Sequence, residues 1–220
     1  MVSKLFQSKS CWLFDLDNTL YSPKSKIFDQ IDVRMKKYIS KKLKISENEA
    51  FIIQKSFYKK YGTTLYGLMH KYNFDPDHFL NFVHNVDFTN LKKSKILFKN
   101  LELLPGTKIV YTNGDEKYAR KVLEYLGIIN IFDEIFDIKK ANYLPKPMIR
   151  PLKKLLKKNK IEPKSCVYFE DLSKNLMPAH NIGITTIHIT PNEIEKSPPF
   201  INFRFKTIIS ALDMIKNCIN

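Results

Sequence analysis

Short apolar segments that end at polar residues recur along this chain and constrain its fold more than any other feature. The segment 11–14, Cys-Trp-Leu-Phe, runs directly into Asp15, and such segments are typical of strands buried in a parallel sheet. Comparable segments lie at 108–111, 131–136, 166–169 and 185–189. Helices are predicted between or after them at 115–126, 148–158, 175–181 and 207–218. The alternation predicts an α/β protein with a Rossmann-like, doubly wound parallel sheet.

Residues 21–100 break this alternation and are predicted to form a helical insertion. Apolar residues recur at helical spacing over 27–39. Two helix starts are marked as well: the segment 46–49, Ser-Glu-Asn-Glu, is a capping box, and Asp75 precedes a proline at the first helical position. We therefore divide the chain into an α/β core, residues 1–20 and 101–220, and an inserted helical cap, residues 21–100.

A net charge of +15 at pH 7 would suggest nucleic-acid binding. Only 4 of the 37 basic residues are arginine, however, and arginine is the residue that bonds bases and phosphates bidentately. No basic run is interleaved with aromatic residues as in a nucleic-acid-binding module. Residues 21–100 hold 16 basic residues against 7 acidic ones, so the charge is densest on the insertion. We expect a lysine-rich solvated surface that attracts anionic ligands, with non-catalytic nucleic-acid binding as an alternative.

Hydropathy and cysteine content indicate where the protein works. No apolar run approaches the roughly 18 residues that cross a bilayer, so a membrane-spanning protein is excluded. The first ten residues lack the long apolar stretch of a secretory signal. Cys11, Cys166 and Cys218 are odd in number and far apart, which favours reduced thiols over a disulfide framework or a zinc site. We expect a cytoplasmic protein.

Polar side chains follow the first two predicted strands directly. Asp15 and Asp17 lie two residues apart, so one can act as a nucleophile and the other as an acid or base if a cation offsets their repulsion. Thr112 offers a hydroxyl after the second strand, and Asn113 and Gly114 follow at the start of a helix, a place suited to an anion. Because ligands bind at the carboxyl ends of parallel strands, we expect these groups to converge.

Two later segments add a cation and further carboxylates. Lys146 lies between two prolines, which fix the direction of its side chain, and Glu170 and Asp171 follow the fourth strand, with Asn175 four residues after Asp171. Oxygen ligands from Asp15 and Asp171 suit Mg²⁺, which binds few protein carboxylates. Each motif alone is typical of a turn, a loop or a helix start. Their joint occurrence near the strand ends predicts a single site.

The chain resembles the phosphatases of the haloacid dehalogenase superfamily over residues 11–190. The motifs of that family correspond here to Asp15, Asp17 and Thr19, to Thr112, to Lys146, and to Glu170 with Asp171. The resemblance implies a catalytic core and a mobile helical cap at the insertion. The dehalogenases of the superfamily lack the second acid because no alkoxide leaving group needs a proton, so Asp17 favours phosphoryl transfer.

The resemblance also implies a mechanism for the hydrolysis of a phosphomonoester. Asp15 attacks phosphorus to give an aspartyl-phosphate. Asp17 protonates the leaving oxygen and then takes a proton from the attacking water. The cofactor is Mg²⁺, held by the Asp15 carboxylate, the Asp17 backbone carbonyl and Asp171.

Further residues are assigned to the phosphoryl group and to its supports. The resemblance implies that the Thr112 hydroxyl and the backbone N–H groups of Leu16, Asp17 and Asn113 bind the phosphoryl group. Lys146 is a catalytic residue that offsets the charge on Asp15 and on the phosphoryl oxygens. Thr19 and Asn175 are expected to orient these groups, whereas Glu170 either contacts the metal or orients a water or Lys146.

Within the superfamily, the chain is similar to the pyrimidine 5′-nucleotidases of yeast type. The similarity rests on the segment 14–21, Phe-Asp-Leu-Asp-Asn-Thr-Leu-Tyr, and on the cap segment 58–64, Tyr-Lys-Lys-Tyr-Gly-Thr-Thr. It implies a nucleoside monophosphate as substrate, with its base in contact with Tyr61, Gly62, Thr63 and Thr64. The same four residues are also typical of a helix end followed by the cap of the next helix. A phosphatase for another small phosphomonoester, such as a sugar phosphate or phosphoglycolate, is the alternative, because the strand-end residues recognise only the phosphate.

Overall fold

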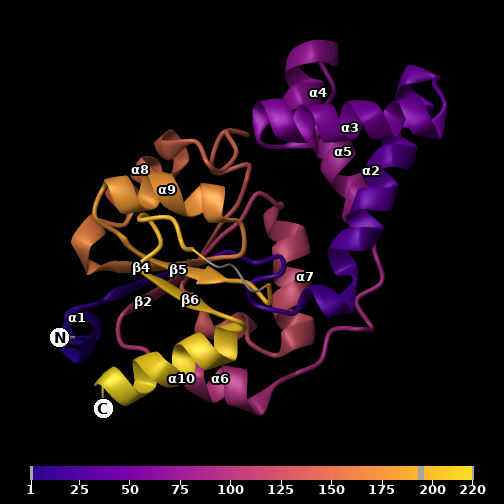
Figure 1. The fold of residues 1–220 in the computed structure, drawn as a ribbon. Coiled ribbons are helices and arrows are strands. Elements are labelled where there is room, and N and C mark those ends of the chain that lie inside the picture. The colour runs from indigo at the N-terminus through magenta and orange to yellow at the C-terminus, as the bar shows by residue number, and fades with distance from the viewer. Residues whose placement is uncertain (1, 193–195, 220) are drawn as a thin grey trace.

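The computed structural model describes residues 2–192 and 196–219. Six parallel strands form one sheet in the order β3-β2-β1-β4-β5-β6 (Figure 1). The strands are β1 (Cys11–Phe14), β2 (Thr107–Tyr111), β3 (Glu134–Phe136), β4 (Cys166–Glu170), β5 (Thr185–Ile189) and β6 (Phe203–Phe205). The connections reverse direction between β1 and β4, which is the switch point at which doubly wound sheets bind ligands. The predicted α/β class with a Rossmann-like parallel sheet is confirmed.

Helices cover both faces of the sheet. One face carries α8 (Ile149–Lys158) and α9 (Ser173–Asn181), and the other carries α1 (Val2–Gln7), α6 (Lys95–Glu102), α7 (Glu116–Leu126) and α10 (Ile208–Ile219) (Figure 1). Alternate residues of β1 enter two separate apolar cores, with Trp12 and Phe14 on the α7 and α10 side and Cys11 and Leu13 on the α8 and α9 side. Burial on both faces is why these strands are continuous apolar runs.

The cap helices stand apart from the sheet layers (Figure 1). They are α2 (Ile27–Leu43), α3 (Glu47–Tyr61), α4 (Thr64–Tyr72) and α5 (Pro76–Val83). The predicted capping box is present, since the Glu49 N–H donates to Ser46 Oγ and the Ser46 N–H donates to the Glu49 carboxylate. Asp75 caps α5 as expected.

The structure adds detail to the sequence-based expectations at several elements, among them helix α1, which was not predicted. The third strand begins at Glu134 and not at residue 131, because Ile129–Ile131 forms a 3₁₀ turn. A short strand, β6, was not predicted and pairs with the edge of β5. Helix α6 spans the expected boundary at residue 100 and packs against α10, with Asn100 Nδ2 donating to Asp213 Oδ1 at 2.8 Å. The last residues of the 21–100 segment therefore pack against α10.

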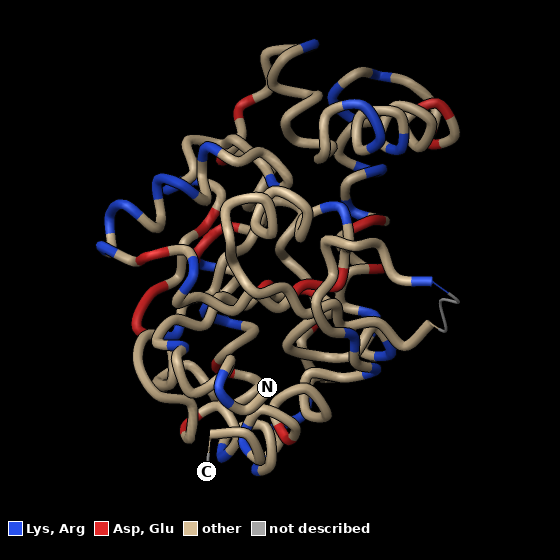
Figure 2. Tube along the Cα trace, turned by 60° about the vertical axis from the view of Figure 1, so that its left-hand side comes forward, with Lys and Arg blue, Asp and Glu red and all other residues tan. Residues whose placement is uncertain are grey.

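The structure also shows where the basic residues and the cysteines lie and how apolar the helices are. Lysine and arginine positions lie on both the cap and the core (Figure 2). Within the described residues, no helix combines the length and the apolar character needed to cross a membrane. Cys11 and Cys166 face each other in register on β1 and β4 as free thiols.

Candidate active site

Asp15 lies at the centre of the polar cluster beyond the carboxyl end of β1. Its backbone N–H donates to the Phe169 carbonyl of β4 at 2.9 Å, which continues the pairing of the two strands by one residue. Its Oδ2 accepts a hydrogen bond from Thr19 Oγ1 at 2.8 Å, and its Oδ1 accepts one from Lys146 Nζ at 2.5 Å. The side chain is buried. Thr19 and Lys146 therefore each bond to one oxygen of the Asp15 carboxylate.

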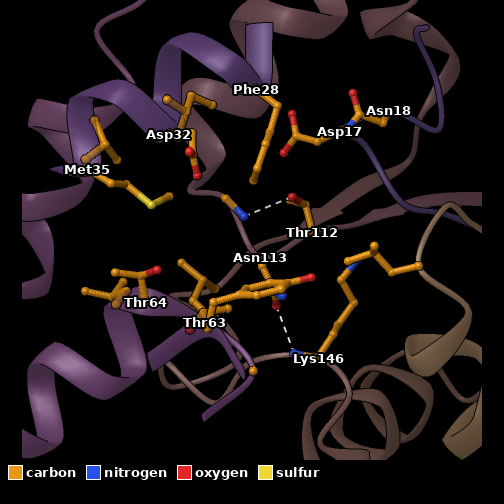
Figure 3. Close-up of a pocket in the computed structure, with 18 of the residues that line it drawn as sticks. Asp17, Asn18, Phe28, Asp32, Met35, Thr63, Thr64, Thr112, Asn113 and Lys146 are labelled. Carbon is orange, nitrogen blue, oxygen red and sulfur yellow. Dashed lines mark hydrogen bonds between the residues drawn. The ribbon is translucent and has the colours of Figure 1, made fainter. Parts of the chain in front are cut away.

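Lys146 reaches the same cluster from the loop before α8. Its Nζ donates to Glu170 Oε2 at 2.9 Å and to the Tyr111 carbonyl at 3.0 Å, in addition to Asp15. Burial alone would lower the pKa of Lys146, but the carboxylates of Asp15 and Glu170 raise it above its ordinary value. The backbone N–H of Lys146 donates to Asn113 Oδ1 at 2.9 Å (Figure 3). The Asn113 side chain thus holds the Lys146 loop, a role that sequence reasoning did not assign to it.

Glu170 supports Lys146 from the end of β4. Its Oε2 accepts from Lys146 and from the Tyr168 hydroxyl, the latter at 2.5 Å, and its Oε1 accepts from Asn175 Nδ2 at 2.7 Å. A longer hydrogen bond at 3.4 Å joins the Leu172 N–H to Oε1. Both oxygens of Glu170 are therefore engaged by the protein. Of the roles considered for Glu170, the structure shows the contact with Lys146.

Asp15, Glu170 and Asp171 form a group of carboxylates that fits a metal ion. One carboxylate oxygen from each lies within 4.8 Å of the other two. Burial and the charge of Glu170 raise the pKa of Asp15 to about 7, and burial and the charges of Asp15 and Glu170 raise that of Asp171 to about 9. A divalent cation would relieve this crowding of negative charge, and hard oxygen donors suit one. Asp15 and Glu170 both accept hydrogen bonds from protein groups on each of their oxygens, whereas no described group donates to the Asp171 carboxylate.

Asp17 is held by two phenols. Its Oδ1 accepts hydrogen bonds from Tyr21 Oη and from Tyr118 Oη, each at 2.5 Å. Burial and the neighbouring Asp17 carboxylate raise the pKa of both tyrosines well above their ordinary value. Tyr21 belongs to the same loop as Asp17, whereas Tyr118 comes from α7. Sequence reasoning missed Tyr118, since nothing local to residues 112–126 marks it as a partner of Asp17.

The groups expected to bind phosphate lie around these carboxylates. Thr112 Oγ1 accepts a hydrogen bond from the Gly114 N–H at 2.9 Å, which orients the hydroxyl and leaves its hydrogen available (Figure 3). Within the described part of the chain, the backbone N–H groups of Leu16, Asp17 and Asn113 have no protein acceptor. These donors are therefore free to bind an anion.

A cavity of about 320 Å³ lies between the core and the cap. Its core side includes Asp15, Asp17, Thr112, Asn113, Lys146 and Asp171. Its cap side includes Phe28, Asp32, Met35, Gln54, Thr63 and Thr64, several of which are seen opposite Thr112 and Lys146 (Figure 3). The volume lies within the range of sites for small organic ligands.

The cap segment 61–64 is divided between the cavity and the cap interior. Gly62, Thr63 and Thr64 line the cavity, and they also have the helix-end roles expected of them, because Gly62 ends α3 and Thr63 caps α4. Tyr61 does not line the cavity. Its ring packs within the cap, with centroid separations of 5.6 Å from Phe57 and 6.2 Å from His70. The expectation that Tyr61 contacts a ligand is therefore not supported by its position.

Gln54 is a cavity residue that the sequence did not reveal. It is 1% exposed, and its Nε2 donates to the Asp32 carbonyl at 3.1 Å and to Asp32 Oδ1 at 2.7 Å. Among the residues that the structure describes, none bonds to its Oε1. The two donations of Nε2 fix the direction of the amide, so Oε1 is the atom left for a ligand. Asp32 lies on α2 and Gln54 on α3, and no spacing rule connects them.

The cap touches the core beside this cavity. A Cβ built on Gly62 would lie 3.2 Å from the Lys146 carbonyl oxygen, so the end of α3 rests against the loop that carries Lys146. Lys174 Nζ of α9 lies 4.0 Å from the centre of the Tyr58 ring of α3. These contacts join the end of α3 to the Lys146 loop and to α9 beside the cavity.

A family model and a curated protein match the sequence of this chain. A family model described as haloacid dehalogenase-like hydrolase matches residues 12–189. Phosphate metabolism protein 8 of Saccharomyces cerevisiae is 26% identical over 140 residues, which is 58% of this chain and 43% of that protein. The chain thus spans less than half the length of this curated relative.

Solved structures of low identity share the fold. A haloacid dehalogenase phosphatase from Thermococcus onnurineus superposes with a TM-score of 0.64 at 19% identity, over 94% of this chain and 97% of that one. The hydrolase YfnB of Bacillus subtilis, solved with magnesium, gives 0.61 at 14%, over 96% and 99%. A 2-haloacid dehalogenase from Pseudomonas syringae gives 0.60 at 16%, over 94% and 97%. Because the family model covers most of the chain, the protein belongs to the haloacid dehalogenase-like hydrolases.

Proposed function

We propose that the protein is a Mg²⁺-dependent phosphomonoesterase that works through an aspartyl-phosphate on Asp15, with pyrimidine nucleoside 5′-monophosphates as substrates. The observation that carries this proposal is the pair of carboxylates at one end of the cavity. Asp15 is bonded to Lys146, and Asp17 is bonded to two phenols. One carboxylate is thereby prepared to attack and the other to transfer a proton.

The reaction follows from these positions. An Asp15 oxygen attacks phosphorus while the bond to the leaving oxygen breaks, and Asp17 gives that oxygen its proton. Asp17 then takes a proton from the water that hydrolyses the aspartyl-phosphate. Thr112 and the free N–H groups beside it bind the phosphoryl oxygens, and Lys146 balances their charge. When bound by Asp15, Asp171 and the Asp17 backbone carbonyl, Mg²⁺ supplies further neutralisation of those oxygens.

Asp17 is also the reason to favour phosphate esters over haloacids. A halide leaves without a proton, whereas an alkoxide leaving group requires one, and Asp17 is the acid that can provide it. The dehalogenases among the structural neighbours share the fold at 16% identity or less, which carries no information about the leaving group.

The cap side of the cavity supports an organic group of mixed polarity as the rest of the substrate. Phe28 and Met35 offer apolar surface, whereas Thr63 and Thr64 offer hydroxyls. The Gln54 carbonyl oxygen lacks a donor within the described part of the chain, and a buried acceptor left unpaired costs about 1–3 kcal/mol. The N3–H of uracil or the amino group of cytosine would supply that donor. The positive charge of the cap would assist the encounter with such an anion.

We further propose that the protein works in the cytoplasm. Its two buried thiols, Cys11 and Cys166, lie in register on neighbouring strands and are not joined. Reduced cysteines in such a pair are typical of a reducing compartment.

The test is a screen of purified protein with Mg²⁺ or with EDTA against UMP, CMP, GMP and glucose 6-phosphate. We expect Mg²⁺-dependent release of phosphate, highest with UMP and CMP, and none from Asp15→Asn. Asp29→Asn, at an exposed position on α2, is the matched control and should behave as the parent protein. Full activity in Asp15→Asn would refute the aspartyl-phosphate, and a preference for glucose 6-phosphate would refute the nucleotide assignment alone.

A further inference from the structure

The two phenols on Asp17 are directed at a single oxygen. Tyr21 Oη and Tyr118 Oη lie 3.3 Å apart, and both donate to Asp17 Oδ1. A carboxylate oxygen has two lone-pair positions, so Oδ1 is fully used. Among the described residues, none donates to Oδ2. The carboxylate of Asp17 is therefore asymmetric, with one oxygen bound to the protein and the other directed elsewhere.

The phenols are held firmly in these positions. Tyr21 and Tyr118 are 7% and 1% exposed. The Tyr118 ring stacks on His84, with centroids 4.3 Å apart and planes at 16°, and a Cβ built on Gly114 would lie 3.1 Å from Tyr118 Cδ1. His84 is fixed in turn by a 2.8 Å hydrogen bond to Asp115. Rotation of the Tyr118 ring away from Asp17 would require several of these groups to move.

We propose that Tyr21 and Tyr118 are positioning residues that hold Asp17 so that its Oδ2 is the oxygen that exchanges the proton with the leaving group. The inference rests on the phosphomonoesterase proposed above. In the first step the Asp15–phosphorus bond forms, the phosphorus–leaving-oxygen bond breaks, and the Oδ2 proton moves to the leaving oxygen. In the second step Oδ2 takes one proton from the attacking water. The tyrosines keep their protons throughout and touch no reacting atom.

A leaving-group series separates this role from a structural one. Tyr21→Phe, Tyr118→Phe and the double variant are assayed with p-nitrophenyl phosphate, whose leaving group needs no proton, and with the best alkyl phosphate of the screen. Proton transfer by a positioned acid contributes roughly 10²–10⁴-fold, so we expect the double variant to lose about 10- to 100-fold in kcat on the alkyl ester. We expect less than about 3-fold loss on p-nitrophenyl phosphate.

Equal losses on the two esters, or no loss on either, would overturn the inference. The single variants each remove one hydroxyl and serve if the double variant fails to fold. Tyr143→Phe is the matched control, because it also removes a phenol-to-carboxylate hydrogen bond, here to Asp77, but outside the cluster around Asp17. Asp17→Asn should also lose more kcat on the alkyl ester than on p-nitrophenyl phosphate, and the difference should be larger than in the tyrosine variants. Absence of activity on both esters in the parent protein would instead refute the proposed function.

Discussion

Lys146 Nζ lies 2.5 Å from Asp15 Oδ1, and the two side chains are 3% and 8% exposed. The same ammonium lies 2.9 Å from Glu170 Oε2, whose side chain is 1% exposed. Buried charges repay the cost of leaving water only when they stay paired, so the three groups depend on one another. The Lys146 loop is thereby joined to the ends of β1 and β4.

Replacement of Lys146 by methionine leaves Asp15 and Glu170 without their cation. Removal of one partner from a buried ion pair costs about 3–5 kcal/mol, and we expect a loss of that size in the free energy of unfolding at pH 7. Activity should be lost as well, because Lys146 no longer balances charge at phosphorus. Urea unfolding and the phosphatase assay measure the two effects. Lys153→Met, at an exposed position on α8, should change neither, and a Lys146→Met protein of unchanged stability would contradict the prediction.

The raised pKa values of Asp15 and Asp171, about 7 and about 9, predict how stability varies with pH in the metal-free protein. The ordinary pKa of an aspartate is about 3.9, so between that value and pH 7 to 9 the folded protein binds more protons than the unfolded chain. Stability should therefore fall as the pH rises from 5 to 8. Added Mg²⁺ should stabilise more at pH 8 than at pH 5, because the metal competes with those protons.

Urea unfolding at pH 5, 6.5 and 8, with EDTA or with Mg²⁺, measures this dependence. Asp171→Asn should flatten the pH dependence and weaken the stabilisation by Mg²⁺, whereas Glu162→Gln, an exposed carboxylate on the core, should leave both unchanged. A metal-free protein that gains stability from pH 5 to pH 8 would show that the carboxylates at the site are not crowded as described.

Gly62 has a backbone conformation that favours glycine, and it also lies against the loop that carries Lys146. Its φ of +87° disfavours any other residue by about 1–2 kcal/mol, and an added Cβ would press on the Lys146 carbonyl at 3.2 Å. Gly62→Ala should therefore lose stability and also raise KM, as the cap moves away from the core. Gly183, at φ +94°, has its closest neighbour at 3.4 Å on an exposed lysine side chain. Gly183→Ala should show the stability loss without the change in KM, and equal kinetics in the two variants would contradict this reading of the contact.

A substitution at Gln54 tests whether the cap recognises the base of a nucleotide. At nearly constant volume, Gln54→Met removes the unpaired carbonyl together with the two Nε2 hydrogen bonds to Asp32. The loss of one hydrogen bond of about 1 kcal/mol to the base predicts a roughly 5-fold lower kcat/KM for UMP. The value for p-nitrophenyl phosphate, which carries no donor, should not change. Gln30→Met is the control, because Gln30 bonds to the Asp87 backbone through both Nε2 and Oε1 and does not line the cavity. An equal loss on both substrates would remove Gln54 from substrate recognition.

Short-range patterns were sufficient to predict that polar residues at several strand ends lie together. A strand buried on both faces leaves a continuous apolar run, and the polar residue that ends it must lie at the carboxyl edge of the sheet. Asp15, Thr112 and Glu170 were found in this way. The capping box at Ser46 and the proline after Asp75 likewise marked α3 and α5, because helix ends are stabilised by side chains only two or three residues away.

Other features arise only when distant segments pack together. The three-residue strand β6 has no periodicity of its own and forms because β5 offers an unpaired edge. Tyr118 reaches Asp17 across 101 positions, and Gln54 reaches Asp32 between two cap helices. Hydrogen bonds of this kind depend on the register of whole elements, which local spacing does not encode. Local sequence therefore specified which polar groups lie at the strand ends. Packing over long separations determined how Asp17 is oriented and which cap residues line the cavity.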